Sequence, residues 1–488
     1  MSDNPNQPRV DDAVLGGQVP IPGDSAILGG IEGVKRRLAS AVEQQRIAAL
    51  SEALKYEEAG VDLVIQALQD KSELVEGAAY RLLRKRGEPR VKQALREYKP
   101  WRLFECLHTF GGHSSPVDAF VISSDGQTLV IDSSDGTIKV WNLHTGELRN
   151  TLIGYSGSVK SVVISSDGQT LVSASNVGTV KVWNLYTGEL RSTLQYNSIQ
   201  MYGYSDRSSI FVISPDGNTF VNSTRDGTIN VWELRTRKLR GILQTDFGEV
   251  KSVAISPDGQ TLVSSSNNGI IKVWDLRTRK LRGILQTDVT SPKSVAISPD
   301  GQTLVSSSNN GIIKVWNLHT GQLRSTLQGD SHGWGQSLTI SQDGQTLVSG
   351  RRSSTIKVWN LHTGELISTM LEYYYLLESL TICPFGQILV SSSDEEGIIK
   401  VWNLHTGRRK STLEGHSRPV YAFAISPDGQ TLVSGSNDST IKVWNLHARE
   451  LKRTLKGHSG EVKSVAICPD GQTIVSGSNG EIKVWGVR

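Results

Sequence analysis

Residues 420–450 of this chain read VYAFAISPDGQTLVSGSNDSTIKVWNLHARE, and this stretch decides the fold. It holds three short runs rich in Val, Ile, Thr and aromatic residues: VYAFAIS, QTLVSGS and TIKVWNL. Such runs predict β-strands, and Asp428-Gly429 predicts a tight turn between the first two, because glycine accepts a positive φ. Apolar residues of IKVWNL fall on both faces of the strand. We therefore expect this sheet to be sandwiched between neighbouring sheets.

The same pattern recurs along residues 101–488, with Asp-Gly between the first two strands in eight of nine copies. A tryptophan ends the third strand of each copy, and successive tryptophans are 41 to 49 residues apart. Four antiparallel strands in roughly 40–45 residues are the pattern of a propeller blade, so the sequence predicts an all-β, closed β-propeller. The nine tryptophans are Trp141, Trp183, Trp232, Trp274, Trp316, Trp359, Trp402, Trp444 and Trp485.

These copies resemble the WD40-repeat family over residues 101–488. The resemblance is carried by V-W-[NDE]-L in eight of nine copies and by the Gly-His pairs Gly112-His113, Gly415-His416 and Gly457-His458. It implies a ring closed by pairing the first strand of the chain with the last three. The ninth copy ends at Arg488 with no fourth strand of its own. We therefore expect residues 102–110 to close the last blade and remove an exposed sheet edge.

Nine copies exceed the usual four to eight blades of a propeller. Three arrangements stay open: nine blades in one ring, which we favour, an eight-bladed ring with one copy extruded, and a split or open array. Lys251–Trp274 and Lys293–Trp316 are identical over 24 residues, and Arg235–Asp246 and Arg277–Asp288 over 12. These identities indicate duplication of one 42-residue block, which a ring of neighbour-contacting blades accommodates.

Before the repeats, the composition changes twice. Residues 1–30 carry a doubled A-[VI]-L-G-G motif among Pro and Gly and predict a disordered leader, or else a short docking peptide. Residues 31–99 have apolar residues at helical spacing and predict a small α-helical module, with Gly60 and Gly87 between helices and Pro89 in a first turn. One stretch resembles a single HEAT-type helical pair with Asp70 in its turn, so we name the module HEAT-like.

Composition and motifs exclude several function classes. The net charge is only +4, and no apolar run approaches the ~18 residues of a membrane span. The three cysteines form no CxxC or CxxxC pair, which speaks against a disulfide scaffold and a cysteine zinc site and fits a cytoplasmic location. Nucleotide-binding, nucleophile-elbow and zinc-protease motifs are missing, so we expect no enzyme, no cofactor and no metal.

The WD40 resemblance implies a buried polar network of His, Ser or Thr, Asp and Trp within a blade. One copy carries all four types at the matching places: His416, Ser434, Asp438 and Trp444. Its role is expected to be structural. His458 also matches, but its copy has Asn479 at the aspartate position. The other copies are expected to rely on apolar stacking, because a polar network stabilises only when its members are satisfied.

The resemblance also implies a partner site on the rim, meaning the loops before the first strands and the turns before the third strands. First-strand rim positions are Asp118, Lys160, Phe211, Lys251, Lys293, Gln336, Glu378, Tyr421 and Lys463. Aromatic residues and arginines dominate protein-interface hot spots. The candidate partner-binding residues are therefore Trp334, Arg352, Tyr373, Tyr374, Tyr375, Tyr421, Arg225 and Phe211.

The predicted function is a non-catalytic scaffold that binds other proteins or peptides on this rim, with no membrane partner. The alternative is a nucleic-acid-binding propeller that uses rim Lys and Arg, at Lys160, Lys251, Lys293, Lys463, Arg225 and Arg352. Sparse aromatic residues and the interspersed acids Asp118 and Glu378 disfavour it. The sequence names neither the partner nor the oligomeric state.

Overall fold

The computed structural model divides into two compact units, one of helices (residues 1–105 and 486–488) and one of sheets (residues 106–485). Within the described residues, no helix is long and apolar enough to cross a membrane. The structure describes residues 30–98, 100–111, 117–155, 157, 159–165, 167–175, 179–195, 211–223, 227–234, 236, 238–245, 250–286, 292–308, 310–329, 337–350, 355–371, 377–384, 387–393 and 397–487.

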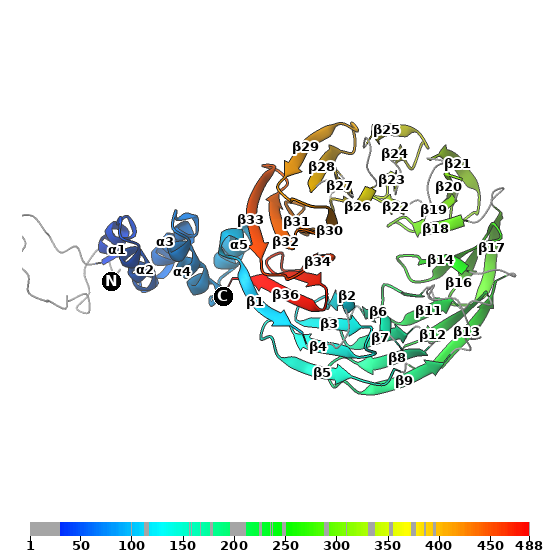
Figure 1. The fold of residues 1–488 in the computed structure, drawn as a ribbon, viewed down its shortest axis with the longest axis horizontal. Helices are drawn as coiled ribbons and strands as arrows, with labels where there is room; N and C mark the ends of the chain where they lie inside the picture. The colour runs from blue at the N-terminus through cyan, green and yellow to red at the C-terminus, as the bar shows by residue number, and fades with distance from the viewer. Residues whose placement is uncertain are drawn as a thin grey trace, which may run out of the picture. The chain divides into compact units, whose positions relative to one another are not determined.

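The second unit is a β-propeller of nine four-stranded antiparallel sheets, which we number as blades 1 to 9 in chain order (Figure 1). Blades 1 to 3 comprise β2 (Val117–Ile122), β3 (Thr128–Ser133), β4 (Ile138–Asn142), β5 (Leu148–Leu152); β6 (Val159–Ile164), β7 (Thr170–Ser175), β8 (Thr179–Asn184), β9 (Leu190–Gln195); β10 (Phe211–Ile213), β11 (Thr219–Ser223), β12 (Thr228–Glu233) and β13 (Lys238–Gln244). Blades 4 to 6 comprise β14 (Val250–Ile255), β15 (Thr261–Ser266), β16 (Ile270–Asp275), β17 (Lys280–Gln286); β18 (Pro292–Ile297), β19 (Thr303–Ser308), β20 (Ile312–Asn317), β21 (Leu323–Gln328); β22 (Ser337–Ile340), β23 (Thr346–Gly350), β24 (Thr355–Asn360) and β25 (Leu366–Leu371). Blades 7 to 9 comprise β26 (Leu377–Ile382), β27 (Ile388–Ser393), β28 (Ile398–Asn403), β29 (Arg409–Glu414); β30 (Val420–Ile425), β31 (Thr431–Ser436), β32 (Thr440–Asn445), β33 (Glu450–Lys456); β34 (Ser464–Ile467), β35 (Ile474–Ser478), β36 (Glu481–Gly486) and β1 (Glu105–Phe110).

The Ser-x-Asp-Gly-Gln-Thr motif builds the turn between the first two strands of a blade. In blade 4, the Ser256 hydroxyl donates to Asp258, and the Gln260 backbone N–H donates to the same carboxylate oxygen at 3.0 Å. These hydrogen bonds lower the pKa of Asp258. Gly259 adopts φ 70°, where a side chain would be strained. The repeated motif therefore fixes the register of the two strands in each blade that carries it.

The apolar core lies between blades rather than within them. Ile and Val of each third strand face the next blade, while Trp faces the previous one, so both faces of the strand are covered as the sequence predicts. Equivalent clusters join every neighbouring pair from blade 1 to blade 8, and blade 9 to blade 1. The cluster between blades 4 and 5 consists of Val263, Ile271, Val273, Leu285, Val295, Leu304, Trp316 and Leu318.

The last pair of blades completes the ring. Blades 8 and 9 are in contact through β30, β31 and β34. The strand β1 lies beside β36 in the sheet order β1-β36-β35-β34, so the start of the repeat region supplies the fourth strand of blade 9 (Figure 1). Phe110 of β1 packs on Trp141 of blade 1 with ring centroids 4.8 Å apart. Among the three arrangements left open by the sequence, the single nine-bladed ring is confirmed.

The strand that closes the ring is shorter than the predicted stretch of residues 102–110. Trp101–Leu103 form a single 3-10 turn, η3, and the strand begins only at Glu105. Pairing with β36 is accompanied by a side-chain contact, in which Lys483 Nζ donates to Thr109 Oγ1 at 3.1 Å.

The first unit is helical, as the 3.6-residue period of the sequence predicts. Its fully buried residues include Ala49, Leu50, Val64, Val75 and Leu83. The elements are α1 (Gly30–Leu38), α2 (Glu43–Ala53), α3 (Glu57–Gln66), η2 (Ala67–Gln69), α4 (Glu73–Arg84) and α5 (Pro89–Glu97).

Gly60 was expected to separate two helices, and this prediction is wrong. It lies inside α3, where a Cβ atom would stand 1.7 Å from the backbone oxygen of Ala53 in α2. The glycine is needed for the close approach of two helices, which the local sequence does not reveal. Asp70 does lie in the turn before α4, where the buried Arg46 donates to it at 3.1 Å.

Candidate functional site

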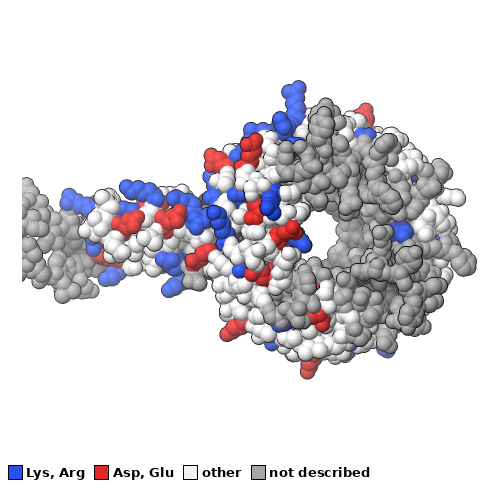
Figure 2. All heavy atoms as spheres, in the orientation of Figure 1, with Lys and Arg blue, Asp and Glu red and all other residues white. Residues whose placement is uncertain are grey.

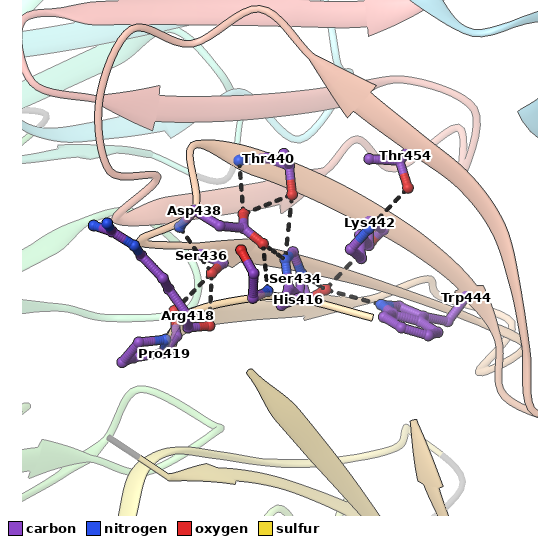
Figure 3. A network of polar contacts seen from close by, with 11 residues as sticks. His416, Arg418, Pro419, Ser434, Ser436, Asp438, Thr440, Lys442, Trp444 and Thr454 are labelled. Atoms are coloured by element: carbon purple, nitrogen blue, oxygen red, sulfur yellow. Dashed lines mark hydrogen bonds and ion pairs between the residues drawn. The ribbon is translucent and has the colours of Figure 1, made fainter. Parts of the chain in front are cut away.

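The polar network predicted in blade 8 is assembled in the structure (Figure 3). His416 Nδ1 lies 2.8 Å from Asp438 Oδ2, and His416 Nε2 lies 2.8 Å from Ser434 Oγ. The Trp444 indole N–H donates to the same serine oxygen at 2.8 Å. The four residues come from β31, β32, the turn between them and the loop before β30. The network therefore ties the loop that enters the blade to its inner strands.

Asp438 holds that loop in place through several hydrogen bonds. Its Oδ2 also accepts the Ser417 backbone N–H at 3.0 Å, and Thr440 donates its backbone N–H and its hydroxyl to Oδ1. Burial opposes ionisation of this carboxyl, but the hydrogen bonds from His416 and Thr440 prevail and hold its pKa well below the usual range. The aspartate is therefore ionised at neutral pH and acts as a fixed anchor.

The anchored loop displays an arginine. The Ser436 hydroxyl lies 2.9 Å from the carbonyl oxygen of Arg418 and 2.8 Å from that of Pro419. The Asn437 backbone N–H donates to the Pro419 carbonyl at 3.0 Å. The Arg418 backbone is thus held on the network while its exposed guanidinium extends away from it (Figure 3). Sequence reasoning missed Arg418, although its place two residues after Gly415-His416 was a usable signal.

Blade 9 contains a second network that the sequence analysis missed. His458 Nδ1 lies 2.9 Å from Glu481 Oε1, and the Ser459 backbone N–H donates to the same oxygen at 3.1 Å. Ser476 accepts from Trp485 at 2.8 Å and contacts His458 Nε2 at 2.7 Å. Glu481 lies four residues before Trp485, not six, and its longer side chain takes the role of the aspartate. Burial lowers the pKa of His458, with Glu481 opposing that shift.

Other blades keep part of this arrangement. In blade 2, Tyr155 replaces the histidine, and its hydroxyl and the Trp183 indole both contact Ser173 Oγ. Burial raises the pKa of this tyrosine. Blade 1 has Ile131 where the others have Ser or Asn, and the buried Trp141 Nε1 finds no hydrogen-bond partner there in the described chain. Indole-to-side-chain bonds also occur at Trp232, Trp274, Trp316, Trp359 and Trp402.

The rim positions of the first strands share a backbone feature. In six blades the pairing of the first strand with the second skips one residue, which forms a β-bulge near the start of the strand. A bulge removes a residue from the ladder and re-aims its side chain, and bulges are frequent beside functional sites. The skipped residues are Asp118, Lys160, Lys251, Lys293, Glu378 and Tyr421, all rim positions that the sequence analysis named.

Two candidate partner-binding residues lie in described segments. Tyr421 is half-buried at its bulge, and its hydroxyl accepts from Asn437 Nδ2 at 3.1 Å, so it stands beside the loop of Arg418. Phe211 begins β10 and pairs with Asn222. The remaining candidates lie outside the described residues: Trp334, Arg352, Tyr373, Tyr374, Tyr375 and Arg225.

The histidines that follow the third strands serve the turn rather than a shared site. The His319 backbone N–H donates to Asn317 Oδ1 at 2.9 Å, and blades 1, 6 and 8 repeat this contact. Within the described part of the chain, no group of three or more His, Cys, Asp or Glu residues is arranged to hold a metal ion.

Comparisons with known families agree with this architecture. A family model described as "WD domain, G-beta repeat" matches residues 407–445 and 449–486, which cover most of blades 8 and 9. A second, described as "Nucleolar protein 10-like, N-terminal domain", matches residues 114–354, from blade 1 into blade 6.

Individual relatives match over short stretches. A stretch of 49 residues is 35% identical to pre-mRNA-processing factor 17 of Saccharomyces cerevisiae, covering 10% of this chain and 11% of that protein. A stretch of 51 residues is 45% identical to the E3 ubiquitin-protein ligase TRAF7 of Mus musculus and of Homo sapiens, covering 10% of this chain and 9% and 8% of those proteins. This chain thus matches about a tenth of the length of these relatives.

A solved structure resembles the chain over a longer range. The crystal structure of the computationally designed Ika8 protein aligns with 78% of this chain and 100% of its own length, at a TM-score of 0.54 and 27% sequence identity.

Proposed function

We propose that this chain, which belongs to the WD40-repeat β-propeller family, is a non-catalytic scaffold that binds other proteins or peptides on its rim. The β-bulge that recurs at the start of the first strand carries the proposal. The same bulge occurs in six blades, and the residue at it is Asp in one blade, Lys in three, Glu in one and Tyr in one. A backbone feature that recurs while the residue type at it varies is suited to recognition.

The described part of the rim favours blade 8 as one contact point. Arg418 is exposed on a loop fixed by the His416–Asp438 network, and Tyr421 lies beside it. Arginine and tyrosine are typical interface anchors, and a pre-fixed backbone lowers the ordering cost of binding. We extend the proposed site to the other predicted residues: Trp334, Arg352, Tyr373, Tyr374, Tyr375, Arg225 and Phe211.

Mixed charge supports a protein or peptide partner rather than nucleic acid. Lys463 pairs with Glu461 at 3.6 Å in blade 9, so this rim lysine has an acidic neighbour. Over blades 8 and 9, the face seen in Figure 2 intersperses acidic with basic side chains. A nucleic-acid surface would need a continuous basic path for the phosphates. All three cysteines are free, which supports a reducing compartment and the cytoplasmic location that we propose.

The test compares two matched double variants. Arg418→Ala with Tyr421→Ala removes the displayed pair, while Arg324→Ala with Tyr186→Ala removes an exposed arginine and tyrosine on other parts of blades 5 and 2. Proteins captured from the native cell by the wild type are identified, and their affinities for each variant are measured. We expect the rim variant to bind about 30-fold more weakly, equivalent to about 2 kcal/mol, with an unchanged melting temperature.

A second rim variant extends the test to Trp334 and Arg352, two predicted binding residues that lie outside the described residues. Trp334→Ala with Arg352→Ala should weaken the same partner without changing stability. Equal capture by wild type and both rim variants would contradict the proposal. A captured ligand that is a nucleic acid, released steeply by salt, would favour the alternative function.

A further inference from the structure

The outer strands of blades 3 and 4 each combine basic residues with two exposed apolar residues. The strands β13 and β17 both read KLRGILQ and lie on the outside of the ring (Figure 1). Lys238 and Lys280 open them, each beside a Leu that pairs with the blade tryptophan. At this register β5 is preceded by Glu147 and β9 by Glu189. This position is Glu365 in blade 6, Glu450 in blade 8, Gln322 in blade 5 and Arg408 in blade 7. Blades 3 and 4 are therefore basic where blades 1, 2, 6 and 8 are acidic.

Basic and apolar side chains alternate in exposed positions along these strands. Leu239 and Leu281 are each 41% exposed, and Ile242 and Ile284 are 58% and 54% exposed. Among the described residues, no ion pair joins the basic side chains here to a carboxylate. The basic side chains are Lys238, Arg240, Arg277, Arg279, Lys280 and Arg282. We call these six residues, with the four apolar ones, the outer strip.

The two described carboxylates that stand opposite the lysines of the outer strip accept hydrogen bonds within their own turns. Glu233 stands opposite Lys238 and accepts from Thr236 Oγ1 at 2.7 Å. Asp275 stands opposite Lys280 and accepts the Thr278 backbone N–H at 2.7 Å. Among the described residues, two carboxylates thus stand opposite the six cations of the outer strip, which leaves this part of the surface with an excess of positive charge.

Arg279 joins the two halves of the outer strip. It adopts φ 61°, in a turn where blades 1, 2, 5, 6 and 7 have glycine, and its guanidinium donates across the blade boundary to the Arg240 carbonyl. Its side chain lies over Gly241, where a Cβ atom would stand 2.8 Å from Arg279 Cδ. The glycine makes room for the arginine. The two basic strands are therefore held at a fixed spacing rather than merely repeated.

We propose that the outer strip binds an acidic segment of a partner protein that also carries apolar residues, at a site separate from the rim. Carboxylates complement the excess of Lys and Arg, and the exposed Leu and Ile contribute apolar contact that a polyanion alone would not use. The strands β13 and β17 are the last of their sheets, so their outer edges offer backbone groups to an extended segment. The duplicated sequence doubles the contact within one ring.

The test uses the full chain and a labelled 16-residue peptide of alternating Glu and Leu, with binding followed by fluorescence anisotropy. Lys238→Glu with Lys280→Glu restores the acidic pattern of blades 1 and 2, so the variant should keep the wild-type melting temperature. We expect it to bind the peptide about tenfold or more weakly. Leu281→Ser with Ile284→Ser should also weaken binding of the Glu-Leu peptide, but should not weaken binding of poly-glutamate of equal length.

The matched control is Arg408→Glu with Lys410→Glu, which makes the same charge change around the outer strand of blade 7 and should leave binding intact. An equal loss in this control would overturn the proposal, because generic charge would then explain binding. Tighter binding of a single-stranded oligonucleotide or of phosphatidylserine vesicles at the same strip would also overturn it. If the Lys→Glu variant melts early, Lys238→Gln with Lys280→Gln gives the same comparison.

Discussion

Blades 4 and 5 differ from blades 8 and 9 in how their inner strands are held. In the described residues of blades 4 and 5, the third-strand tryptophan donates its indole N–H to serine, at 3.0 Å from Trp274 and 3.1 Å from Trp316. The loops that enter these two blades, residues 246–249 and 287–291, lie outside the described residues. Blades 8 and 9 add a histidine and a carboxylate that connect the entering loop to the strands. All four blades contribute to apolar clusters between neighbouring blades: blade 4 with blade 5, blade 8 with blade 7, and blade 9 with blade 1. The apolar clusters therefore stack the blades of both pairs, and in blades 8 and 9 the polar network also holds the entering rim loop.

We expect the largest loss of stability when the ring is opened, because every apolar cluster is built from residues of two neighbouring blades. Deleting residues 1–112 removes β1 and leaves β36 as an unpaired edge beside blade 1. We expect this truncation to aggregate, since an open edge pairs with other chains. Deleting residues 1–99 keeps β1 and should leave a soluble protein with a cooperative melt. Light scattering and calorimetry distinguish the two, and identical behaviour would mean that β1 does not close the ring.

The sequence alone predicts the blades and the polar network of blade 8. The nine Trp-centred copies, the Asp-Gly turns and the tetrad around His416 follow from local patterns that repeat in register. The hydrogen-bonded pairs of the tetrad lie 10 to 22 residues apart within one copy, so the fold of a single blade brings them together. Gly60 is different, because its role depends on the approach of α2, which no local pattern encodes.

The network around His458 shows a second limit. Asn479 occupies the position where an aspartate was required, so the sequence indicates a broken network. One residue is missing from the turn of blade 9, and Glu481 reaches the histidine from the third strand instead. Tyr155 likewise replaces a histidine in blade 2. Side chains of different length satisfied the same hydrogen bonds, which a search for residue types at fixed spacing does not detect.

A serine substitution sharpens the difference between the two kinds of blade. Ser434→Ala leaves both His416 Nε2 and Trp444 Nε1 without their partner, whereas Ser306→Ala leaves only Trp316 Nε1. An unsatisfied buried polar group costs about 1–3 kcal/mol. We therefore expect a loss of about 2–4 kcal/mol for Ser434→Ala and about 1 kcal/mol for Ser306→Ala, measured by denaturant unfolding. Equal losses would show that the histidine adds no stability to blade 8.

The smallest expected effect concerns the pH dependence of blade 9. Hydrogen bonds from Ser459 and His458 outweigh burial and lower the pKa of Glu481, and burial lowers the pKa of His458. Both groups bind protons more readily in the unfolded chain, so the free energy of unfolding decreases, and the protein becomes less stable, as the pH falls. The contribution of His458 is complete above about pH 6.5, and that of Glu481 above about pH 4.3; each is lost as pH drops through the lower folded value.

Glu481→Gln separates these two contributions. At pH 7 we expect a loss of about 1 kcal/mol, the net scale of one ordinary hydrogen bond, because glutamine can still accept from His458 and only the charge is lost. Below about pH 4.5 the variant should lose less stability than the wild type on further acidification, because no depressed carboxylate remains at this position. Melting temperatures from pH 8 to pH 3.5 test this, with the exposed Glu450→Gln as the control. Parallel curves for Glu481→Gln and the wild type would show that Glu481 is not the carboxylate that holds His458, and that the two-network account of blades 8 and 9 is wrong.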